Sequence, residues 1–524
     1  MRASTTSRSV RGDPRRKVRS LPVAVACVIA CGIAPLAQAA SPCAALGKFT
    51  LTGHAVVIRK ALDVPASAPG ISPAVPAHCR VDGAIDERIG RDGKPYAIGF
   101  AVSLPVTWNG RFLFQGGGGL NGSVQPPLGA QYAGENPALA RGFAVASTDS
   151  GHEGAVFDGS FFQDQQAALN FLYGGVAEVT LVAKAIVTRH YGKPQAHAYF
   201  VGCSTGGREA MMMSQRFPNY FDGIVAAAPA ARTSFSNLGL RHATAALNAI
   251  APRDSQGQPQ TRAALSDGDR RTLADGVLEA CDALDGNRDG FIFAPQACAF
   301  DPGALACPGQ KKEGCLSAAQ IDAVRAVMRG PRTTAGRQVY PGYYYDTGIT
   351  NTQGLPGVLA GPVIPEGRPV GTTFDVDAAA AEAMNGRAMA GDTSDWTNLS
   401  TFRSQGGKLI FAHGVSDPWF SAQESVRYYE QLERDNAEAP VRDFSRLFLV
   451  PGMGHCGGGA RTLDQFDLLT ALVDWVETGK PPERVIATGK SAPGESRPLC
   501  PFPAHAHYEG TGDAHLATNY TCSQ

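Results

Sequence analysis

The pentapeptide Gly202-Cys203-Ser204-Thr205-Gly206 holds the residue with the clearest catalytic chemistry, a serine between glycines. An apolar, β-prone run, Tyr199–Val201, precedes it, and helix-forming residues follow. This strand–turn–helix context is typical of a nucleophile elbow, in which the serine hydroxyl projects from a sharp turn. A side chain on either glycine would collide with neighbouring backbone. Ser204 is therefore predicted to be a nucleophile, although so short a motif also occurs by chance in ordinary glycine-rich loops.

A serine nucleophile needs a general base, and the base needs an acid that orients it. In α/β-hydrolases the chain order is serine, acid, histidine. Asp417 follows the apolar run Lys408–Ala412, and His455 follows the run Ser445–Val450. Because the carboxyl ends of parallel strands meet at one edge of a sheet, we expect Ser204, Asp417 and His455 to form a catalytic triad.

Three other residues compete for these roles. His413 precedes the predicted acid and could be a structural histidine near the site. His152 lies upstream of the serine and fits the chain order poorly. Cys203 is the weaker nucleophile, because an elbow presents its central residue, which is Ser204. A lone Asp or His in a loop is usually only solvated, so the prediction depends on two such residues occurring in the right order.

An oxyanion formed at the serine would need two backbone N–H donors. One is expected from Thr205, directly after the nucleophile, and the other from a glycine-rich loop after an early strand. The run Gln115–Gly122 contains four successive glycines and follows an apolar strand. Such a loop lets backbone approach a ligand closely, whereas the alternative is a flexible hairpin turn.

Two cysteines flank the predicted site. Cys203 precedes the nucleophile, and Cys456 follows the predicted base. If Ser204 and His455 meet, their neighbours are brought close, and an oxidising compartment favours a bond between them. We therefore expect a disulfide that ties the serine loop to the histidine loop.

The elements around these residues indicate an α/β fold. Short apolar strands alternate with helical patterns over residues 44–228, and the pattern returns near residues 408 and 445, which favours a mostly parallel, doubly wound sheet. Residues 230–400 lack this alternation. The predicted organisation is a signal peptide (1–39), the first part of an α/β-hydrolase core (40–229), a large inserted lid domain (230–400) and the second part of the core (401–524).

The first forty residues are typical of a secretory signal. They contain seven basic residues and one acid, then an apolar segment and a small-residue cleavage site, Ala37-Gln38-Ala39. The apolar segment is too short for a membrane span, and no later stretch is expected to cross a bilayer. We predict soluble export, secreted or periplasmic. Lipid attachment at Cys31 is the alternative.

Composition excludes several other classes of protein. With 44% apolar and 18% charged residues, the 524-residue chain is typical of a globular protein. Its 47 basic and 47 acidic residues leave no basic excess after the signal, so no nucleic-acid partner is expected. Ten cysteines remain after the signal, and an even number in an exported chain predicts disulfides. Counting does not give their connectivity, but three couples close in sequence suggest themselves: Cys281 with Cys298, Cys307 with Cys315, and Cys500 with Cys522.

An acidic loop, Asp282–Phe291, has the composition of a calcium site. Its Asp and Asn side chains alternate around a glycine, as suits a hard cation. Counted from Asp285, where the EF-hand-like pattern Asp-x-Asn-x-Asp-Gly begins, the twelfth position holds Gln296 where an EF-hand has glutamate. A structural calcium ion is therefore predicted, and a solvated acidic turn is the alternative.

Together these residues resemble the tannase and feruloyl esterase family of α/β-hydrolases, whose mark is a Cys-Ser pair, a distant Asp, and a His-Cys pair joined to the first pair by a disulfide. The resemblance covers nearly all of the chain after the signal. It includes the glycine-rich loop around Gly119 and the segments Trp108–Phe112, Ser214–Val225, Cys281–Gly286 and Phe448–Met453.

The resemblance implies roles for individual residues. Gly119 and Thr205 would supply the oxyanion N–H groups, and Phe420 would contact an aromatic substrate. A structural Ca²⁺ would bind the side chains of Asp282, Asp285 and Asp289 and the carbonyls of Asn287 and Phe291. The implied disulfides are Cys43–Cys79, Cys203–Cys456, Cys281–Cys298, Cys307–Cys315 and Cys500–Cys522.

The predicted function is that of a secreted serine esterase. It would hydrolyse small esters of aromatic acids, of the hydroxycinnamic, gallic or terephthalic type, through an acyl-enzyme. The alternatives are an esterase for other small esters, a peptidase or acyltransferase that uses the same triad, and a non-catalytic, calcium-dependent binding protein. The sequence does not specify the oligomeric state.

Overall fold

The computed structural model describes residues 41–68, 73–365 and 367–524. The described residues all belong to one compact unit, Ser41–Gln524, which is called the second unit because it follows residues 1–40. The predicted signal peptide and Cys31 lie outside the described residues, so export stays a prediction.

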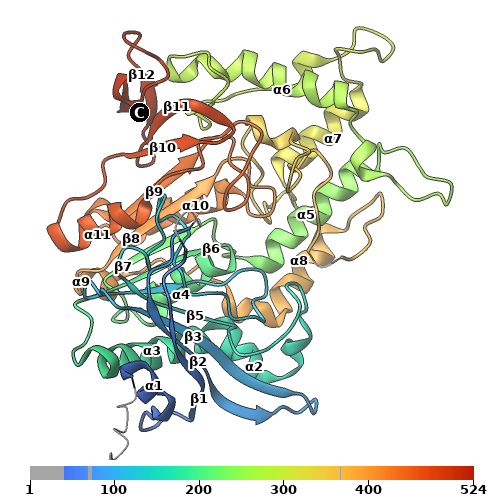
Figure 1. The fold of residues 1–524 in the computed structure, drawn as a ribbon. Helices are drawn as coiled ribbons and strands as arrows, with labels where there is room; N and C mark the ends of the chain where they lie inside the picture. The colour runs from blue at the N-terminus through green and yellow to red at the C-terminus, as the bar shows by residue number, and fades with distance from the viewer. Residues whose placement is uncertain (1–40, 69–72, 366) are drawn as a thin grey trace, which may run out of the picture. The chain divides into compact units, whose positions relative to one another are not determined.

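A nine-stranded sheet forms the centre of the second unit, with strand order β1-β2-β3-β5-β4-β6-β7-β8-β9 (Figure 1). The first three strands run antiparallel to their neighbours, and β5, β4, β6, β7, β8 and β9 are mutually parallel. This confirms the predicted α/β-hydrolase sheet. The strands are β1 (Val56–Val64), β2 (His78–Ile89), β3 (Pro95–Pro105), β4 (Arg111–Gln115), β5 (Ala144–Thr148), β6 (His197–Cys203), β7 (Gly223–Ala227), β8 (Lys408–Gly414) and β9 (Ser445–Val450).

Both faces of the parallel strands are buried. Successive side chains of a strand point to opposite faces of the sheet, and here each face packs against an apolar core. In β6, for example, Phe200 belongs to one apolar core, and Tyr199 and Val201 belong to the other. The helices α3 (Gly175–Tyr191), α4 (Thr205–Arg216) and α10 (Ala422–Asp435) pack on the first face. The helix α11 (Leu468–Thr478) packs on the second, so the sheet is covered on both sides.

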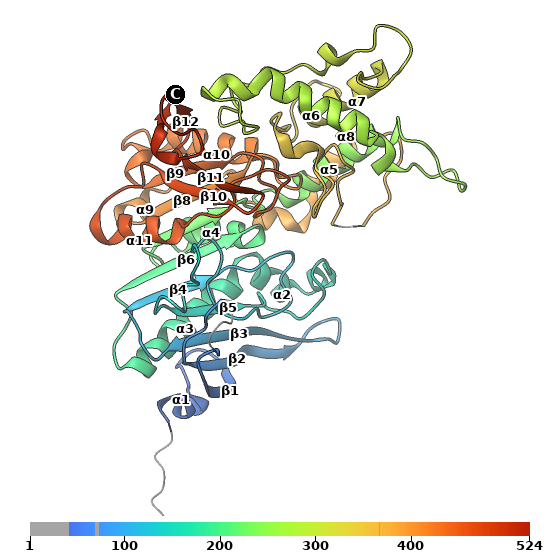
Figure 2. The same ribbon diagram turned by 45° about the horizontal axis from the view of Figure 1, so that its top comes forward.

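Residues 228–407 connect β7 to β8, although these strands are direct neighbours in the sheet. This long connection has its own small apolar clusters. It is the segment in which the sequence predicts an inserted lid. Four of its helices gather at one side of the second unit (Figures 1 and 2), namely α5 (Thr233–Asn248), α6 (Asp267–Cys281), α7 (Ala318–Arg329) and α8 (Val376–Asn385). The short helix α9 (Ser400–Ser404), just before β8, lies away from them.

The C-terminal segment after α11 contains regular secondary structure. It forms two small antiparallel sheets, β10 (Val485–Gly489) with β11 (Ala492–Leu499), and β12 (His505–Tyr508) with β13 (Tyr520–Ser523). The bond Cys500–Cys522 joins the residue directly after β11 to β13. The strands are short and rich in polar residues, which hides them from pattern analysis.

One helical stretch, Gln165–Tyr191, is long and apolar enough to cross a membrane by length and composition. This differs from the expectation that no such stretch follows the signal. It comprises α2 (Gln165–Leu169), a π-helical turn (Asn170–Gly174) and α3. Most of its residues are buried against the sheet, as in the core helix of a globular protein. The remaining helix, α1 (Pro42–Ala45), is a single turn.

Candidate active site

Ser204 lies at the sharp turn between β6 and α4, where the sequence predicts an elbow. Its backbone angles, φ 65° and ψ −123°, are unfavourable for an L-residue and mark a strained position. The tight turn explains the flanking glycines: a Cβ on Gly202 would lie 2.5 Å from the carbonyl oxygen of Gly206. The serine is therefore held at the carboxyl edge of the sheet by a turn that only this glycine pattern permits.

Asp417 and His455 meet after β8 and β9, at the same edge of the sheet. The Nδ1 atom of His455 lies 2.7 Å from Oδ2 of Asp417. The other carboxylate oxygen accepts the backbone N–H groups of Trp419 (2.9 Å) and Phe420 (3.1 Å). The acid is therefore anchored to its own loop and fixes the orientation of the histidine ring.

The carboxyl group of Asp417 is fully buried. Burial alone would raise its pKa, but His455 and His413 together hold the pKa of this carboxyl well below its usual range. Asp417 is therefore ionised across the whole neutral and mildly acidic range. An ionised acid can stabilise the imidazolium that forms when the histidine takes a proton from a nucleophile.

The disulfide Cys203–Cys456 brings the serine and histidine loops together, with Cα atoms 5.9 Å apart. Both Ser204 and His455 line the same cavity. The Nε2 atom of His455 lies 3.6 Å from Sγ of Cys456, and the described residues include no hydrogen bond from Ser204 to it. Such hydrogen bonds often form only when substrate binds.

The two competing histidines occupy other positions. His413 is buried, and its ring nitrogens contact Oγ of Ser425 (2.7 Å) and the carbonyl of Phe420 (2.9 Å). Its Nε2 also lies 3.4 Å from Oδ2 of Asp417, so it supports the acid from behind. His152 is buried against the ring of Phe161, with ring centroids 3.7 Å apart. Neither of them lines the cavity.

The glycine-rich loop packs directly on the start of α4. The backbone N–H of Gly206 donates to the carbonyl of Gly117 (3.1 Å), and the hydroxyl of Thr205 donates to the carbonyl of Gly119. Gly119 has φ +59°, and a Cβ there would lie 2.6 Å from the side chain of Val156. The two predicted oxyanion donors, Gly119 and Thr205, are thus linked to each other, and both line the cavity.

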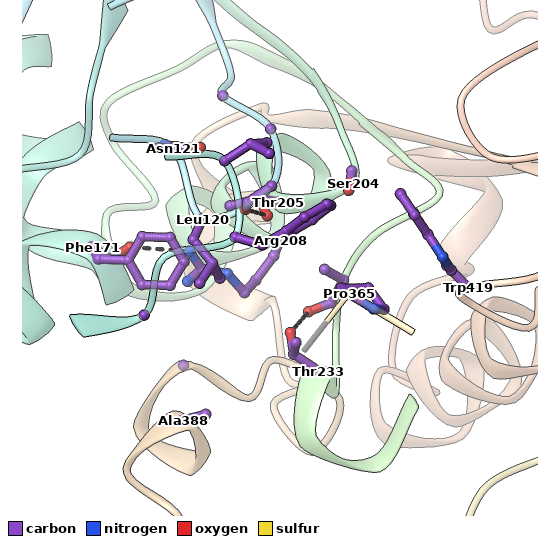
Figure 3. Close-up of a pocket in the computed structure, with 18 of the residues that line it drawn as sticks. Leu120, Asn121, Phe171, Ser204, Thr205, Arg208, Thr233, Pro365, Ala388 and Trp419 are labelled. Carbon is purple, nitrogen blue, oxygen red and sulfur yellow. Dashed lines mark hydrogen bonds between the residues drawn. The ribbon is translucent and has the colours of Figure 1, made fainter. Parts of the chain in front are cut away.

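A cavity of ≈ 920 Å³ opens beside Ser204 (Figure 3). Aromatic side chains make up much of its wall, and the predicted contact Phe420 is one of them. Sequence reasoning missed the others: Phe157, Phe162, Phe171 and Trp419. Trp419 follows the acid by two residues and could have been inferred from that position. The three phenylalanines come from the segment between β5 and α3, for which the sequence holds no comparable signal.

Arg208 supports one part of this wall. It is almost fully buried on α4 and donates to the carbonyls of Leu172 (2.7 Å) and Phe171 (3.0 Å), in the π-helical turn. Its guanidinium also lies over the ring of Phe171, 4.7 Å from the ring centroid. Figure 3 shows Arg208 reaching from the elbow helix toward Phe171. The arginine therefore couples α4, the helix that begins directly after Ser204, to the aromatic wall.

The predicted calcium loop has buried acids. Asp282 accepts the N–H of Gly290 (3.0 Å), and Asp285 accepts that of Phe293 (2.9 Å). Burial raises the pKa of both carboxyls, that of Asp285 to about 7. No ion pair reaches either acid among the described residues, so both fit a hard cation.

The third acid of that loop is differently placed. Asp289 pairs with the buried Arg497, and the amide of Asn287 donates to it (2.8 Å). The part of the chain that the structure describes has no group of three or more His, Cys, Asp or Glu side chains that could hold a metal ion. Calcium binding therefore stays a prediction, which the paired Asp289 fits less well than Asp282 and Asp285.

Five disulfide bonds occupy the ten cysteines of the second unit, in the same pairs that the family resemblance implies. Cys281–Cys298 closes the acidic loop, and Cys307–Cys315 lies further along the same connection. Cys43–Cys79 joins the start of the unit to β2, and the other two are the bonds already described at the site and in the C-terminal segment.

The fold and the site geometry define an α/β-hydrolase, and comparison with known proteins gives the family. The family model for tannase and feruloyl esterase matches residues 79–386 and 370–523. The chain therefore belongs to the tannase and feruloyl esterase family, as predicted, and is a carboxylic ester hydrolase.

Individual relatives agree with this assignment. Mono(2-hydroxyethyl) terephthalate hydrolase from Piscinibacter sakaiensis is 38% identical over an alignment that covers 87% of each chain. A probable feruloyl esterase B-2 from Aspergillus terreus is 31% identical and covers 86% of this chain and 87% of its own. The crystal structure of feruloyl esterase B from Aspergillus oryzae superposes with a TM-score of 0.74 at 26% identity, over 92% of this chain and 99% of that one.

Proposed function

We propose that this protein is an exported serine esterase that hydrolyses small esters of aromatic carboxylic acids. The observation that carries the proposal is one cavity in which Ser204 and His455 lie beside several aromatic side chains. Relatives named for feruloyl and terephthalate esters support the aromatic acid. The five disulfides support export into an oxidising compartment.

In the first half-reaction, Ser204 attacks the ester carbonyl while His455 accepts its proton at Nε2. Asp417, hydrogen-bonded at 2.7 Å to the other ring nitrogen, holds that ring in place and stabilises its positive charge. The N–H groups of Thr205 and Gly119 stabilise the oxyanion. His455 then gives the proton to the departing alcohol, which leaves an acyl-enzyme on Ser204.

In the second half-reaction, water replaces the alcohol. His455 takes a proton from the water, whose oxygen attacks the acyl carbonyl, and the same N–H groups stabilise the second oxyanion. Return of the proton to Ser204 releases the aromatic acid. A metal ion is not needed for either step, so the predicted calcium ion would serve only to hold the loop at residues 282–291.

The cavity suggests where the two parts of a substrate lie. Trp419 and Phe420 offer flat apolar surfaces close to the catalytic histidine, as an aromatic acyl group requires, and Phe157 contacts Trp419 in the same cavity. Trp419 and Phe420 have ring centroids 4.9 Å and 5.2 Å from that of His455. Polar side chains line other parts of the cavity and suit the hydroxyls of an acid or alcohol: Ser123, Gln125, Gln131, Ser234 and Asn237.

The test is hydrolysis of an ester panel by purified protein, with Ser204→Ala as the control. The panel contains methyl ferulate, methyl gallate, chlorogenate, mono(2-hydroxyethyl) terephthalate and a short aliphatic ester. We expect serine-dependent turnover of at least one aromatic ester in preference to the aliphatic one. Turnover of the aliphatic ester alone would remove the aromatic assignment, and no turnover by folded protein would favour a binding function.

A further inference from the structure

Glu209 is a buried acid on α4 that the triad chemistry does not use. Its carboxylate accepts hydrogen bonds from the N–H of Gly117 (2.9 Å) and from the side-chain amide of Asn121 (2.7 Å). These two residues stand on either side of Gly118, Gly119 and Leu120. One carboxylate thus fastens both ends of the segment that contains the proposed oxyanion donor Gly119.

A buried carboxylate is costly unless donors or a cation compensate it. Glu209 is 1% exposed, and no ion pair to it occurs among residues 41–68, 73–365 and 367–524. Three hydrogen-bond donors compensate its charge, the third being Oγ of Ser150 (3.0 Å), and the neighbouring Arg208 interacts with it electrostatically. All three groups donate, so the position requires an acceptor at both carboxylate oxygens.

Two of the three residues that donate to Glu209 have strained backbones. Asn121 has φ 55° and Ser150 has φ 64°, conformations that L-residues other than glycine rarely adopt. Strain of this kind persists where surrounding contacts enforce it and clusters at functional sites. The side chain of Asn121 also covers Gly117 so closely that a Cβ there would lie 2.2 Å from its amide oxygen.

We propose that Glu209 is a positioning residue for the oxyanion loop, holding the backbone of residues 117–121 so that the N–H of Gly119 points toward the reacting carbonyl. This inference rests on the proposed esterase function. The loop is already tied to α4 through Thr205 and Gly206. Glu209 adds the contact that fixes its far end, and it connects that end to the helix of the nucleophile.

The test compares kcat and KM of Glu209→Gln with those of wild type on the best ester of the panel. Glutamine places an NH₂ group where one of the donors now points, so either Gly117 or Asn121 loses its acceptor. We expect kcat to fall about 10²-fold with KM changed by less than about threefold, as for a damaged oxyanion hole. Ser214→Ala, a buried polar deletion on the same helix, is the matched control and should leave kcat unchanged.

Inhibitor binding separates positioning from general loosening of the structure. An aromatic boronic acid forms a tetrahedral adduct on Ser204 and uses the oxyanion donors, whereas the product acid does not require them. In Glu209→Gln, binding of the boronate should weaken by the same factor by which kcat/KM falls. The inhibition constant of the product acid should stay within about twofold of its wild-type value. Equal weakening of both inhibitors, or an unchanged kcat in folded Glu209→Gln, would overturn the proposal.

Two further results keep the outcomes distinct. If Glu209→Gln does not fold, Ser150→Ala removes one donor to the carboxylate and should lower kcat about fivefold, since one hydrogen bond to a charged group is lost. An unchanged kcat in that variant would then refute the inference. Wild-type turnover that Ser204→Ala abolishes is measured first, because its absence refutes the esterase function, whereas active wild type with unaffected variants refutes only the role of Glu209.

Discussion

Cys203 and Cys456 are joined by a disulfide across 253 residues of sequence, and each is the immediate neighbour of a proposed catalytic residue. The hydroxyl of Tyr132 approaches both, at 3.4 Å from Sγ of Cys203 and 3.3 Å from the carbonyl of Cys456. The bond therefore does more than close a long loop. It sets the separation between the turn that holds Ser204, after β6, and the loop that holds His455, after β9.

Replacing both cysteines by serine is expected to lower kcat and stability together. Loss of a disulfide typically costs about 2–4 kcal/mol, and a looser His455 loop weakens proton transfer from Ser204. The measurements are kcat for the best ester and the free energy of unfolding. The double variant Cys307→Ser with Cys315→Ser, which opens a short loop of the connection, is the control and should lose stability with kcat retained. Equal kcat in both double variants would contradict the clamp.

Asp417→Asn is expected to lower kcat by roughly 10³–10⁴-fold with little change in KM. Asparagine cannot stabilise the imidazolium of His455 and can present its amide to the wrong ring nitrogen. Steady-state kinetics on the best ester would measure the effect. His413→Gln is the matched comparison, because His413 contacts the same oxygen at 3.4 Å but does not line the cavity, and a much smaller loss is expected.

Ionisation of Asp417 is also expected to make the stability of the folded protein depend on pH. The pKa of Asp417 lies below its unfolded value, so its ionised form stabilises the folded protein above about pH 4. This contribution is lost as the pH falls through the folded pKa. The difference in unfolding free energy between wild type and Asp417→Asn should therefore shrink below about pH 4. A difference that stays constant down to pH 2 would argue against an ionised, paired carboxylate.

Thr205 makes a separable contribution through its hydroxyl. That hydroxyl donates to the carbonyl of Gly119 and so links the two proposed oxyanion donors. Thr205→Val keeps the shape but removes the bond, and kcat should fall about fivefold. Thr205→Ser retains the hydroxyl and should recover most of the activity. Equal kinetics for the two variants would show that the link has no catalytic effect.

Trp419 is expected to select for aromatic acyl groups. Its ring contacts that of Phe157, with centroids 6.0 Å apart, and its indole N–H donates to the carbonyl of Val363 (2.9 Å). Trp419→Ala should raise KM about tenfold for an aromatic ester and much less for an aliphatic one. Trp396→Ala, an exposed tryptophan outside the cavity, is the control. A similar change in KM for both esters would remove Trp419 from substrate recognition.

The sequence predicts those parts of the site that local patterns encode. Ser204, Asp417 and His455 each follow an apolar strand, so their shared edge follows from topology alone, and a glycine run marks the loop at Gly119. Side chains that reach the site from elsewhere carry no such signal. Phe157 and Phe171 become cavity walls only through the packing of the segment between β5 and α3. Glu209 has the sequence context of an ordinary helix residue, and only the fold shows the three donors around it.

The antiparallel edge of the sheet, strands β1 to β3, could not be predicted from local sequence patterns either. The strand β1 alternates partly buried and exposed residues but carries charged side chains such as Arg59 and Lys60, which weaken its apolar pattern. Its pairing with β2 depends on contacts between segments far apart in the chain. Long-range pairing of this kind is a tertiary property, and it overrides local propensity.

Calcium should stabilise the protein if the acidic loop binds it. Asp282 and Asp285 are buried without an ion pair among the described residues, so a bound cation would relieve the cost of their charges. Addition of Ca²⁺ at 100 times its Kd should increase the unfolding free energy by about 2.7 kcal/mol, measured as a rise in Tm over protein treated with chelator.

Asp285→Asn should abolish this rise, whereas Asp301→Asn, which changes an exposed acid paired with Arg325, should keep it. A Tm that does not respond to Ca²⁺ in wild type would mean that the hydrogen bonds of the loop and the pairing of Asp289 with Arg497 hold it without a metal.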